Sequence, residues 1–238
     1  SEGDIVRVFD NKDNFLAVGH YQPGSIAVRI LSFIDVEPDI SFFRQAVLRA
    51  WEFRKAAGLT GNSSLNVFRL IHAEGDGLPG LIADYYNGVV VMQMHSVGMY
   101  RIRKELAGII REIPGLQVKA VYDKSGSTIP FMSGIKPDNE FLFGDSEPVI
   151  VTEYGFRFKI DWIGGQKTGF FIDQRENRRL LGEYAKDRSV LNMFGYTGGF
   201  SVYAMKDARI VHSVDSSAQA VELADENVKL NFGDDPRH

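Results

Sequence analysis

The sequence predicts an α/β fold with α+β parts. Three observations carry this prediction: strand-like runs separated by turn residues fill residues 1–38, apolar residues then recur at helical spacing, and a strand, glycine turn, helix, strand order follows near the C-terminal end. With 238 residues there is room for one large domain or two to three small ones. We expect three parts, residues 1–38, 39–148 and 149–238.

The composition is that of an ordinary globular protein. Hydrophobic residues make up 44% and charged residues 24%, which excludes a disordered or collagen-like chain. No apolar run approaches the ~18 residues of a membrane helix, and the first residues do not resemble a signal peptide, so no membrane partner is expected. Cysteine is absent, which excludes disulfides, thiolate metal sites and a cysteine nucleophile in this chain and fits a cytoplasmic location. The formal net charge of −4 gives no basic surplus for nucleic acid.

The first 38 residues are predicted to form a β-meander. Turn residues, at Asp10–Asn14 and at Pro23-Gly24, separate three strand-like runs. These runs are Ile5–Phe9, Phe15–Tyr21 and Ile26–Leu31. Three short strands are only marginally stable alone, so we expect them to belong to a small barrel whose other strands lie elsewhere or outside this chain.

The middle part, residues 39–148, is predicted to be an α+β domain. Apolar residues recur at helical spacing from Phe43 to Trp51, and Gly58 ends this first helix. A second helix is expected over about Gly98–Glu112. The expected strands are Phe68–His72, Leu81–Tyr85, Val89–His95 and Val118–Tyr122. Residues 123–148, rich in Asp, Ser, Gly, Pro and Asn, are expected to be an irregular linker.

The last part contains a strand, a glycine-rich turn, a helix, a second strand and an acid in succession. They are Val190–Phe194, Gly195–Gly199, Phe200–Met205, Ile210–Val214 and Asp215, and a predicted hairpin of Val149–Thr152 and Phe156–Ile160 precedes them. Gly195 lies 20 positions before Asp215, about the offset at which Rossmann-type folds place a carboxylate on the ribose hydroxyls. Glycines let the backbone approach such a ligand closely.

These residues favour a nucleoside ligand without phosphates. The dinucleotide pattern GxGxxG is absent from residues 195–200, which weakens the case for NAD or FAD. The pattern GxxxxGK[ST] is broken because Gln166 precedes Lys167-Thr168, which disfavours a nucleoside triphosphate. S-adenosylmethionine needs the turn and the acid but no pyrophosphate cradle, whereas an unliganded α/β core is the alternative. The five histidines show no metal-ligand spacing, so no metal is expected.

A glycine loop with two aromatic and several basic residues, 164–178, comes before this unit. Asp173 and Glu176 have the spacing of a capping box, so a helix N-cap is the alternative to a binding role for Asp173. A cap does not explain why the aromatic and basic residues gather in one loop.

Three strings of this chain resemble the bacterial ribosomal RNA large-subunit methyltransferase I family: GQKTGFFIDQRENRR, VLNMFGYTGGFSVYA and VHSVDSSAQAVELADENVKLN. Upstream, EGDGLPGLIADYYNG resembles the central domain of the family, and the opening meander resembles part of its N-terminal PUA domain, an RNA-binding β-barrel. The resemblance implies S-adenosylmethionine-dependent methylation of carbon 5 of a cytosine in 23S ribosomal RNA. It also implies a partial PUA-like barrel, a central α+β domain and the start of a Rossmann-like class I methyltransferase domain.

The same resemblance implies the residues of a cofactor pocket. These are Lys167, Phe170, Asp173 and Arg175 from the loop, and Asn192, Phe194, Tyr196, Thr197, Gly198, Asp215 and Ser216 from the turn and the second strand. Core packing is the alternative for Phe194 and Tyr196. The family's Asp-Pro-Pro loop and attacking cysteine do not occur here, so we expect a fragment of a longer protein and name no catalytic residue.

Other functions stay open. One is a methyltransferase for another RNA base or for a small molecule, because the cofactor half does not encode the acceptor. Another is a non-catalytic RNA-binding protein. The expected partner is ribosomal RNA, and a homodimer is left open. A single surface carrying the basic residues of the middle part would favour RNA binding. These residues are Arg101, Arg103, Lys104, Lys119 and Lys124.

Overall fold

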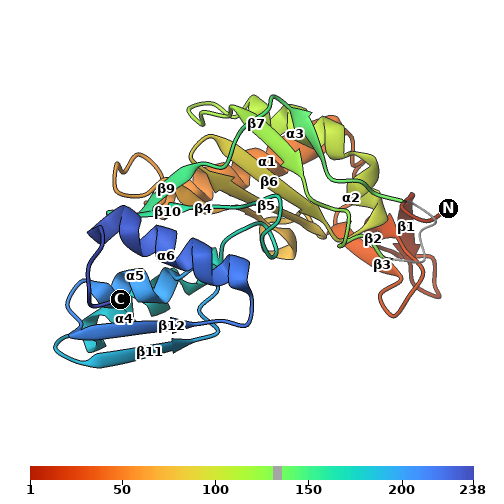
Figure 1. Cartoon of the computed structure of the whole chain (residues 1–238). Coiled ribbons are helices and arrows are strands. Elements are labelled where there is room, and N and C mark those ends of the chain that lie inside the picture. The colour runs from red at the N-terminus through yellow and green to blue at the C-terminus, as the bar shows by residue number, and fades with distance from the viewer. Residues whose placement is uncertain (131–135) are drawn as a thin grey trace. The chain divides into compact units, whose positions relative to one another are not determined.

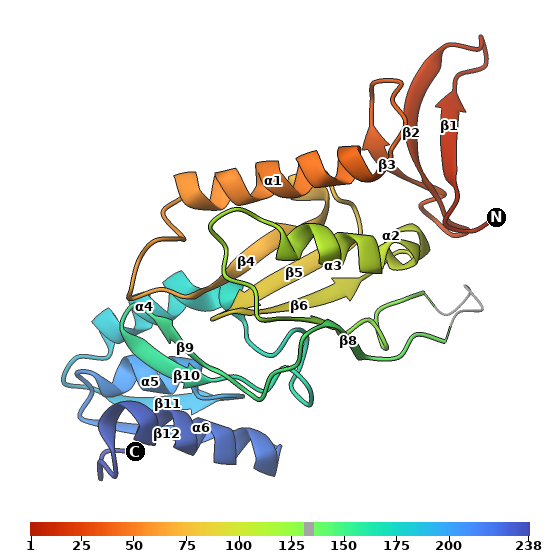
Figure 2. The ribbon, with the colours of Figure 1, turned by 90° about the horizontal axis from the view of Figure 1, so that it is seen from above.

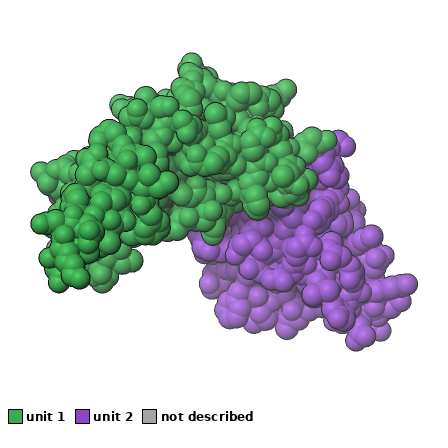
Figure 3. All heavy atoms as spheres, turned by 180° about the vertical axis from the view of Figure 1, so that it is seen from behind, with its two compact units in different colours: residues 1–61, 68–147 green, residues 62–67, 148–238 purple. Residues whose placement is uncertain are grey.

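A computed structural model describes residues 1–130 and 136–238 (Figure 1). Contacts divide the chain into two compact units, residues 1–61 with 68–147 and residues 62–67 with 148–238, which Figure 3 shows in different colours. The predicted division between residues 38 and 39 therefore falls inside the first unit. Each unit is described by itself below.

The first unit begins with an antiparallel meander, as predicted. Its strands are β1 (Ile5–Phe9), β2 (Phe15–Tyr21) and β3 (Val28–Ser32), in that order in the sheet. The third strand begins at Val28 and not at Ile26. The amide of Gln22 donates to the carbonyl of Ala27 at 2.9 Å, so the turn closes there and pairing starts one residue later.

A five-stranded sheet forms the centre of the first unit. In spatial order it consists of β4 (Val67–His72), β5 (Leu81–Tyr86), β6 (Val89–Met94), β7 (Ala120–Asp123) and β8 (Glu140–Phe143). The strands β5 and β6 are antiparallel, β6 and β7 parallel, and β7 and β8 antiparallel. The prediction that 123–148 is an irregular linker is wrong at β8, which pairs with β7. Residues 131–135 of that predicted linker lie outside the described residues.

Two longer helices pack on this sheet: α1 (Ile40–Ala56) and α3 (Arg103–Arg111) contact each other over it (Figure 2). Asp39 caps α1 by accepting from the amide of Phe42. The predicted helix 98–112 is two helices, because α2 (Val97–Arg101) ends at Ile102, whose φ of −103° leaves the helical range. A short 3-10 turn, η1 (Ala73–Asp76), follows β4. The core is apolar, with Trp51 stacked on Phe68.

The second unit contains a hairpin and a parallel βαβ element, both as predicted. The hairpin pairs β9 (Ile150–Glu153) with β10 (Phe156–Lys159). After it come η3 (Ile172–Gln174), α4 (Arg175–Tyr184), β11 (Ser189–Met193), α5 (Gly199–Met205), β12 (Ile210–Val214) and α6 (Ala218–Phe232). The strands β11 and β12 run parallel, so the acid after β12 and the turn after β11 meet at the same end of the sheet.

Candidate cofactor site

The turn between β11 and α5 has a left-handed backbone at three positions. The φ angles are 58° at Phe194, 45° at Tyr196 and 72° at Gly198. The amide of Gly198 donates to the carbonyl of Gly195 at 2.9 Å, which closes the turn. A Cβ at Gly198 would lie 2.8 Å from the Cβ of Ala224 on α6, so a side chain does not fit there. Strained non-glycine backbone of this kind concentrates at ligand sites.

Asp215 directly follows β12 and accepts a hydrogen bond from the backbone of this turn. Its Oδ2 accepts from the amide of Tyr196 at 2.9 Å, and its Oδ1 accepts from the amide of Ser217 at 3.0 Å. The hydrogen bonds from Ser217 and Tyr196 hold the pKa of Asp215 below its ordinary value. The carboxylate is therefore ionised at neutral pH, and its remaining lone pairs can accept from hydroxyl groups of a ligand.

Tyr196 connects the turn to the loop of residues 164–169. Its hydroxyl accepts from the amide of Gln166 at 2.8 Å and donates to the carbonyl of Gly169 at 3.2 Å. Burial raises the pKa of Tyr196, so the hydroxyl remains a donor. The ring also meets Phe171 edge-on, at 5.4 Å between centroids. The side chain of Tyr196 thus joins the loop to the turn, which the resemblance assigned to one pocket.

A cavity of about 230 Å³ lies between this loop, the turn and the start of α6. It is lined by Asp161, Gly164, Gly165, Gln166, Tyr196, Asp215, Ser217, Gln219, Ala220 and Leu223. Asp161 and Gln219 are additions to the predicted site. The Oδ1 of Asp161 accepts from the amide of Gly164 at 2.8 Å, and its Oδ2 accepts from Gln219 at 3.3 Å. The signal in the sequence was an acid placed three residues before a glycine, which is typical of a turn held by its own side chain.

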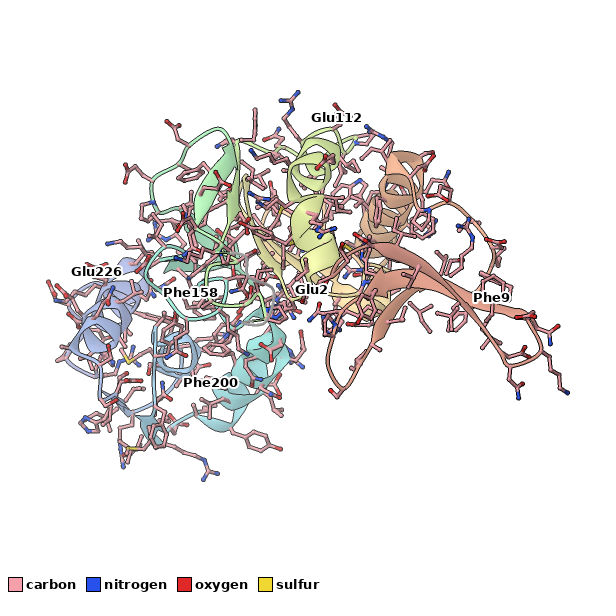
Figure 4. All side chains as sticks on the ribbon, turned by 90° about the vertical axis from the view of Figure 1, so that its right-hand side faces the viewer. Glu2, Phe9, Glu112, Phe158, Phe200 and Glu226 are labelled. Atoms are coloured by element: carbon pink, nitrogen blue, oxygen red, sulfur yellow. The ribbon has the colours of Figure 1, made fainter. Side chains whose placement is uncertain are left out.

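A second cavity shares Tyr196 with the first, and half of its lining residues are aromatic. Its lining is Phe170, Phe171, Gln174, Arg178, Phe194, Gly195, Tyr196, Thr197, Gly199 and Phe200. Phe170 is buried and packs on Phe158 of β10, which is labelled in Figure 4. Phe194 is 87% exposed, so core packing does not account for it. Lys167 stands at this side of the site, with its Nζ 4.6 Å from the centroid of Phe171.

Three of the predicted loop residues, Lys167, Asp173 and Arg175, lie outside both cavity linings. Arg175 is buried, where its Nε donates to Glu153 at 3.1 Å and its Nη2 to the carbonyl of Val67. Asp173 is exposed within η3 and accepts from Gln174 at 3.3 Å. The interpretation of Asp173 as an N-cap is wrong, because η3 precedes α4 and puts Gln174 at the cap position.

The remaining predicted residues support the turn or lie beside it. Asn192 donates to the hydroxyl of Ser201 at 2.8 Å and so connects β11 to α5. Thr197 is buried in the turn, and its carbonyl accepts from Asn227 of α6 at 2.9 Å. Ser216 is exposed next to Asp215. Asn192 therefore has a structural contact, whereas Thr197 also lines the second cavity.

The basic residues of the middle part do not form a free positive surface. Arg101 pairs with Asp4 at 2.7 Å, and Arg103 pairs with Asp123 and Glu140. Lys124 is only 8% exposed. Acidic neighbours and burial thus take up three of the five side chains proposed for RNA.

Residues 1–130 and 136–238 contain neither a candidate membrane helix nor a candidate cluster of metal ligands. None of the helices there is long and apolar enough to cross a membrane. Within the same residues, no group of three or more His, Asp or Glu side chains could hold a metal ion.

The parallel βαβ element, its left-handed turn and the carboxylate at the second strand end are the arrangement typical of a Rossmann-like nucleoside-binding unit. Residues 68–237 match the model of the S-adenosylmethionine-dependent methyltransferase family, and residues 1–33 match a PUA-like domain. The chain belongs to the S-adenosylmethionine-dependent methyltransferase family.

Individual relatives agree with this assignment. Ribosomal RNA large subunit methyltransferase I of Pseudoalteromonas translucida is 38% identical over 96% of this chain and 58% of the relative, and that of Citrobacter koseri is 35% identical over 97% and 59%. This chain thus spans about three-fifths of the length of the curated relatives it matches. A solved structure from Streptococcus mutans, named for a SAM-dependent methyltransferase, covers 100% of this chain and 61% of its own at a TM-score of 0.86 and 25% identity. A structure described as a methyltransferase complexed with SAH gives the same values.

Proposed function

We propose that the protein binds S-adenosylmethionine in residues 148–238 and methylates ribosomal RNA. One observation carries this proposal: the carboxylate of Asp215, fixed by two backbone amides, lines a cavity beside a glycine turn. Its free lone pairs suit the two ribose hydroxyls of a nucleoside. When bound, the cofactor supplies a methyl group on a sulfonium centre, while this chain's residues bind and orient it.

The charges of the first cavity support an unphosphorylated nucleoside. Asp161 and Asp215 both line it, and each carboxylate is already held by backbone amides. Two carboxylates repel a phosphate but accept hydrogen bonds from hydroxyl and amino groups. A Cβ at Gly165 would lie 2.8 Å from the hydroxyl of Tyr196, so this side of the cavity also depends on a bare backbone. The residues therefore fit the adenosine part of the cofactor.

The RNA substrate is supported by the relatives and by the N-terminal meander. The curated relatives are named ribosomal RNA large subunit methyltransferases, and residues 1–33 match a PUA-like domain. Cytosine carbon 5 in 23S ribosomal RNA is the target that the sequence resemblance implies, and the cytoplasm is where that substrate occurs. Methylation of another base or of a small molecule is the competing hypothesis, because the described cavities concern the cofactor alone.

The test is calorimetric titration of the complete protein with S-adenosylhomocysteine. Asp215→Asn replaces the carboxylate by a weaker acceptor, and charge-assisted hydrogen bonds are worth roughly 1.5–3 kcal/mol. We therefore expect the affinity to fall about tenfold or more. Glu226→Gln removes an exposed acid on α6 that pairs with Lys159, and it should leave the affinity unchanged. Equal affinities for wild type and Asp215→Asn would contradict the assignment.

A further inference from the structure

A buried ion cluster stands in the second unit, centred on Glu153 at the end of β9. This carboxylate is fully buried and receives a bidentate pair from Arg178, with its Nε and Nη2 both at 2.9 Å. Arg175 donates to it at 3.1 Å and the hydroxyl of Tyr203 at 3.0 Å. Burial beside Glu153 raises the pKa of Tyr203, so that hydroxyl remains a donor.

The composition of this cluster is unusual for a purely stabilising core. Two guanidinium groups face one carboxylate, although well-packed apolar residues often stabilise a buried site as well as an ion pair does. The planar fork of an arginine, in contrast, fixes the direction of each hydrogen bond. The cluster is therefore suited to holding a particular geometry.

Arg178 contacts residues on two sides of the second cavity. Its Nη1 donates to the carbonyl of Phe171 at 2.8 Å, and its guanidinium lies 4.4 Å from the centroid of Phe170. On the other side, its Cδ lies 3.1 Å from the place where a Cβ of Gly199 would be. Phe171 in turn contacts Tyr196, and the Nζ of Lys167 lies over its ring.

We propose that Glu153 and Arg178 are positioning residues of the cofactor site. Glu153 orients the guanidinium of Arg178. The guanidinium in turn holds Phe170 and Phe171, which form the wall of the second cavity next to Lys167. This inference rests on the proposed function. Neither residue needs to contact the cofactor, since the guanidinium is engaged by Glu153 and by the carbonyl of Phe171.

The first experiment compares affinities of the complete protein for S-adenosylhomocysteine. Arg178→Lys keeps the charge but loses the bidentate fork, so the affinity should fall about tenfold. Glu153→Gln should have a similar effect, and Tyr203→Phe, which removes one hydroxyl, a smaller one. Arg179→Lys is the matched control: this neighbour is exposed and pairs with Glu176 and Glu183, so the affinity should not change. Circular dichroism identifies the variants that fold, and Tyr203→Phe is mild enough to keep the test valid.

The second experiment separates positioning from simple stability. In a Phe171→Ala background the wall is already lost, so Arg178→Lys should cost much less affinity than it does in the wild type. Fully additive losses, or unchanged affinity in folded Arg178→Lys and Tyr203→Phe, would overturn the inference. Failure of the wild-type protein to bind S-adenosylhomocysteine would instead refute the proposed function, so the two failures are distinguishable.

Discussion

Asp215 has two tasks in the second unit, since the carboxylate proposed for the ribose also fixes the turn. Tyr196 has a left-handed backbone, which costs a non-glycine residue of the order of 1–3 kcal/mol. The bond from its amide to Asp215 and the bonds of its hydroxyl to residues 166 and 169 hold it there. The turn is therefore preorganised by the protein, before a ligand contributes any binding energy.

Substitution of Gly198 tests how closely the turn approaches α6. Gly198→Ala places a Cβ 2.8 Å from the Cβ of Ala224 and keeps a positive φ, so it adds overpacking to backbone strain. Gly77→Ala is the control, because its φ of 70° and ψ of 23° match the 72° and 15° of Gly198 and nothing lies within 4 Å of the new Cβ. We expect Gly198→Ala to lower the free energy of unfolding by about 1–3 kcal/mol more than the control does. Urea unfolding measures both, and equal losses would show that α6 can move away.

Substitution of Lys167 tests the part of the site next to Phe171. If its ammonium group attracts the carboxylate of the cofactor, Lys167→Ala should weaken S-adenosylhomocysteine more than 5′-methylthioadenosine, which lacks that carboxylate. We expect about a tenfold difference between the two losses in calorimetric titrations. Lys206→Ala changes an exposed lysine after α5 and should affect neither ligand. Equal losses for the two ligands would place Lys167 elsewhere.

The parts of the site that could be predicted are those encoded within a short stretch of chain. The glycine turn and Asp215 lie on consecutive elements, and the parallel pairing of β11 with β12 brings them together. Arg175 was assigned to the pocket because its partner could not be recognised: Glu153 lies 22 residues earlier, in an ordinary hairpin strand. Asp161 was missed for a similar reason, since its contact with Gln219 spans 58 residues.

At the level of helices and strands, the missed elements are those that depend on distant partners. The strand β8 is only Glu140–Phe143, and it forms because Phe143 pairs with Val121 and Phe141 with Tyr122. Its flanking polar residues resemble a loop, and a four-residue strand has little periodicity of its own. The helix break at Ile102 likewise has no glycine or proline to indicate it.

His20 lies between three elements of the first unit. Its burial leads us to predict that the free energy of unfolding depends on pH. His20 lies on β2, stacks on Phe43 of α1, and occupies the space where a Cβ of Gly98 on α2 would be. Burial, with the positive charge of Arg101, lowers its pKa from 6.5 to about 4. Between these values the unfolded chain binds a proton and the folded chain does not, so stability is lost as pH falls through this window.

We therefore expect lowering the pH from 7 to 5 to cost the wild type about 2 kcal/mol more than it costs His20→Gln. Urea unfolding at the two pH values measures this difference, in which other titrating groups cancel. The exposed His72 provides the control, because His72→Gln should retain the wild-type pH dependence. Parallel curves for wild type and His20→Gln would show that folding leaves the pKa of His20 unchanged.

For the whole molecule, the predicted boundary after residue 148 lies one residue from the boundary between the units, whereas the place of segment 62–67 was not predicted. Segment 62–67 belongs to the second unit, where Asn66 bonds to Thr152 and Leu65 bridges to Glu153. Neither composition nor hydrophobic periodicity distinguishes these six residues from their neighbours in the sequence. The outer face of the parallel pair is exposed and apolar: Leu191 is 62% exposed and Met193 50%. Exposed apolar strands of this kind are prone to association.

The last prediction concerns the chemistry of a polypeptide made of these 238 residues alone. Methylation of carbon 5 of cytosine requires a thiolate to add to carbon 6, because the ring carbon is otherwise a poor nucleophile. These residues include no cysteine, so we expect no tritiated methyl transfer to cytosine in deproteinised 23S ribosomal RNA, even where S-adenosylhomocysteine still binds. The complete protein, assayed in parallel, shows whether the substrate is competent. Cytosine-5 product from the 238 residues alone would refute this mechanism. Methylation of a base nitrogen by them would favour the competing hypothesis, since a nitrogen lone pair can attack the methyl group without a thiol.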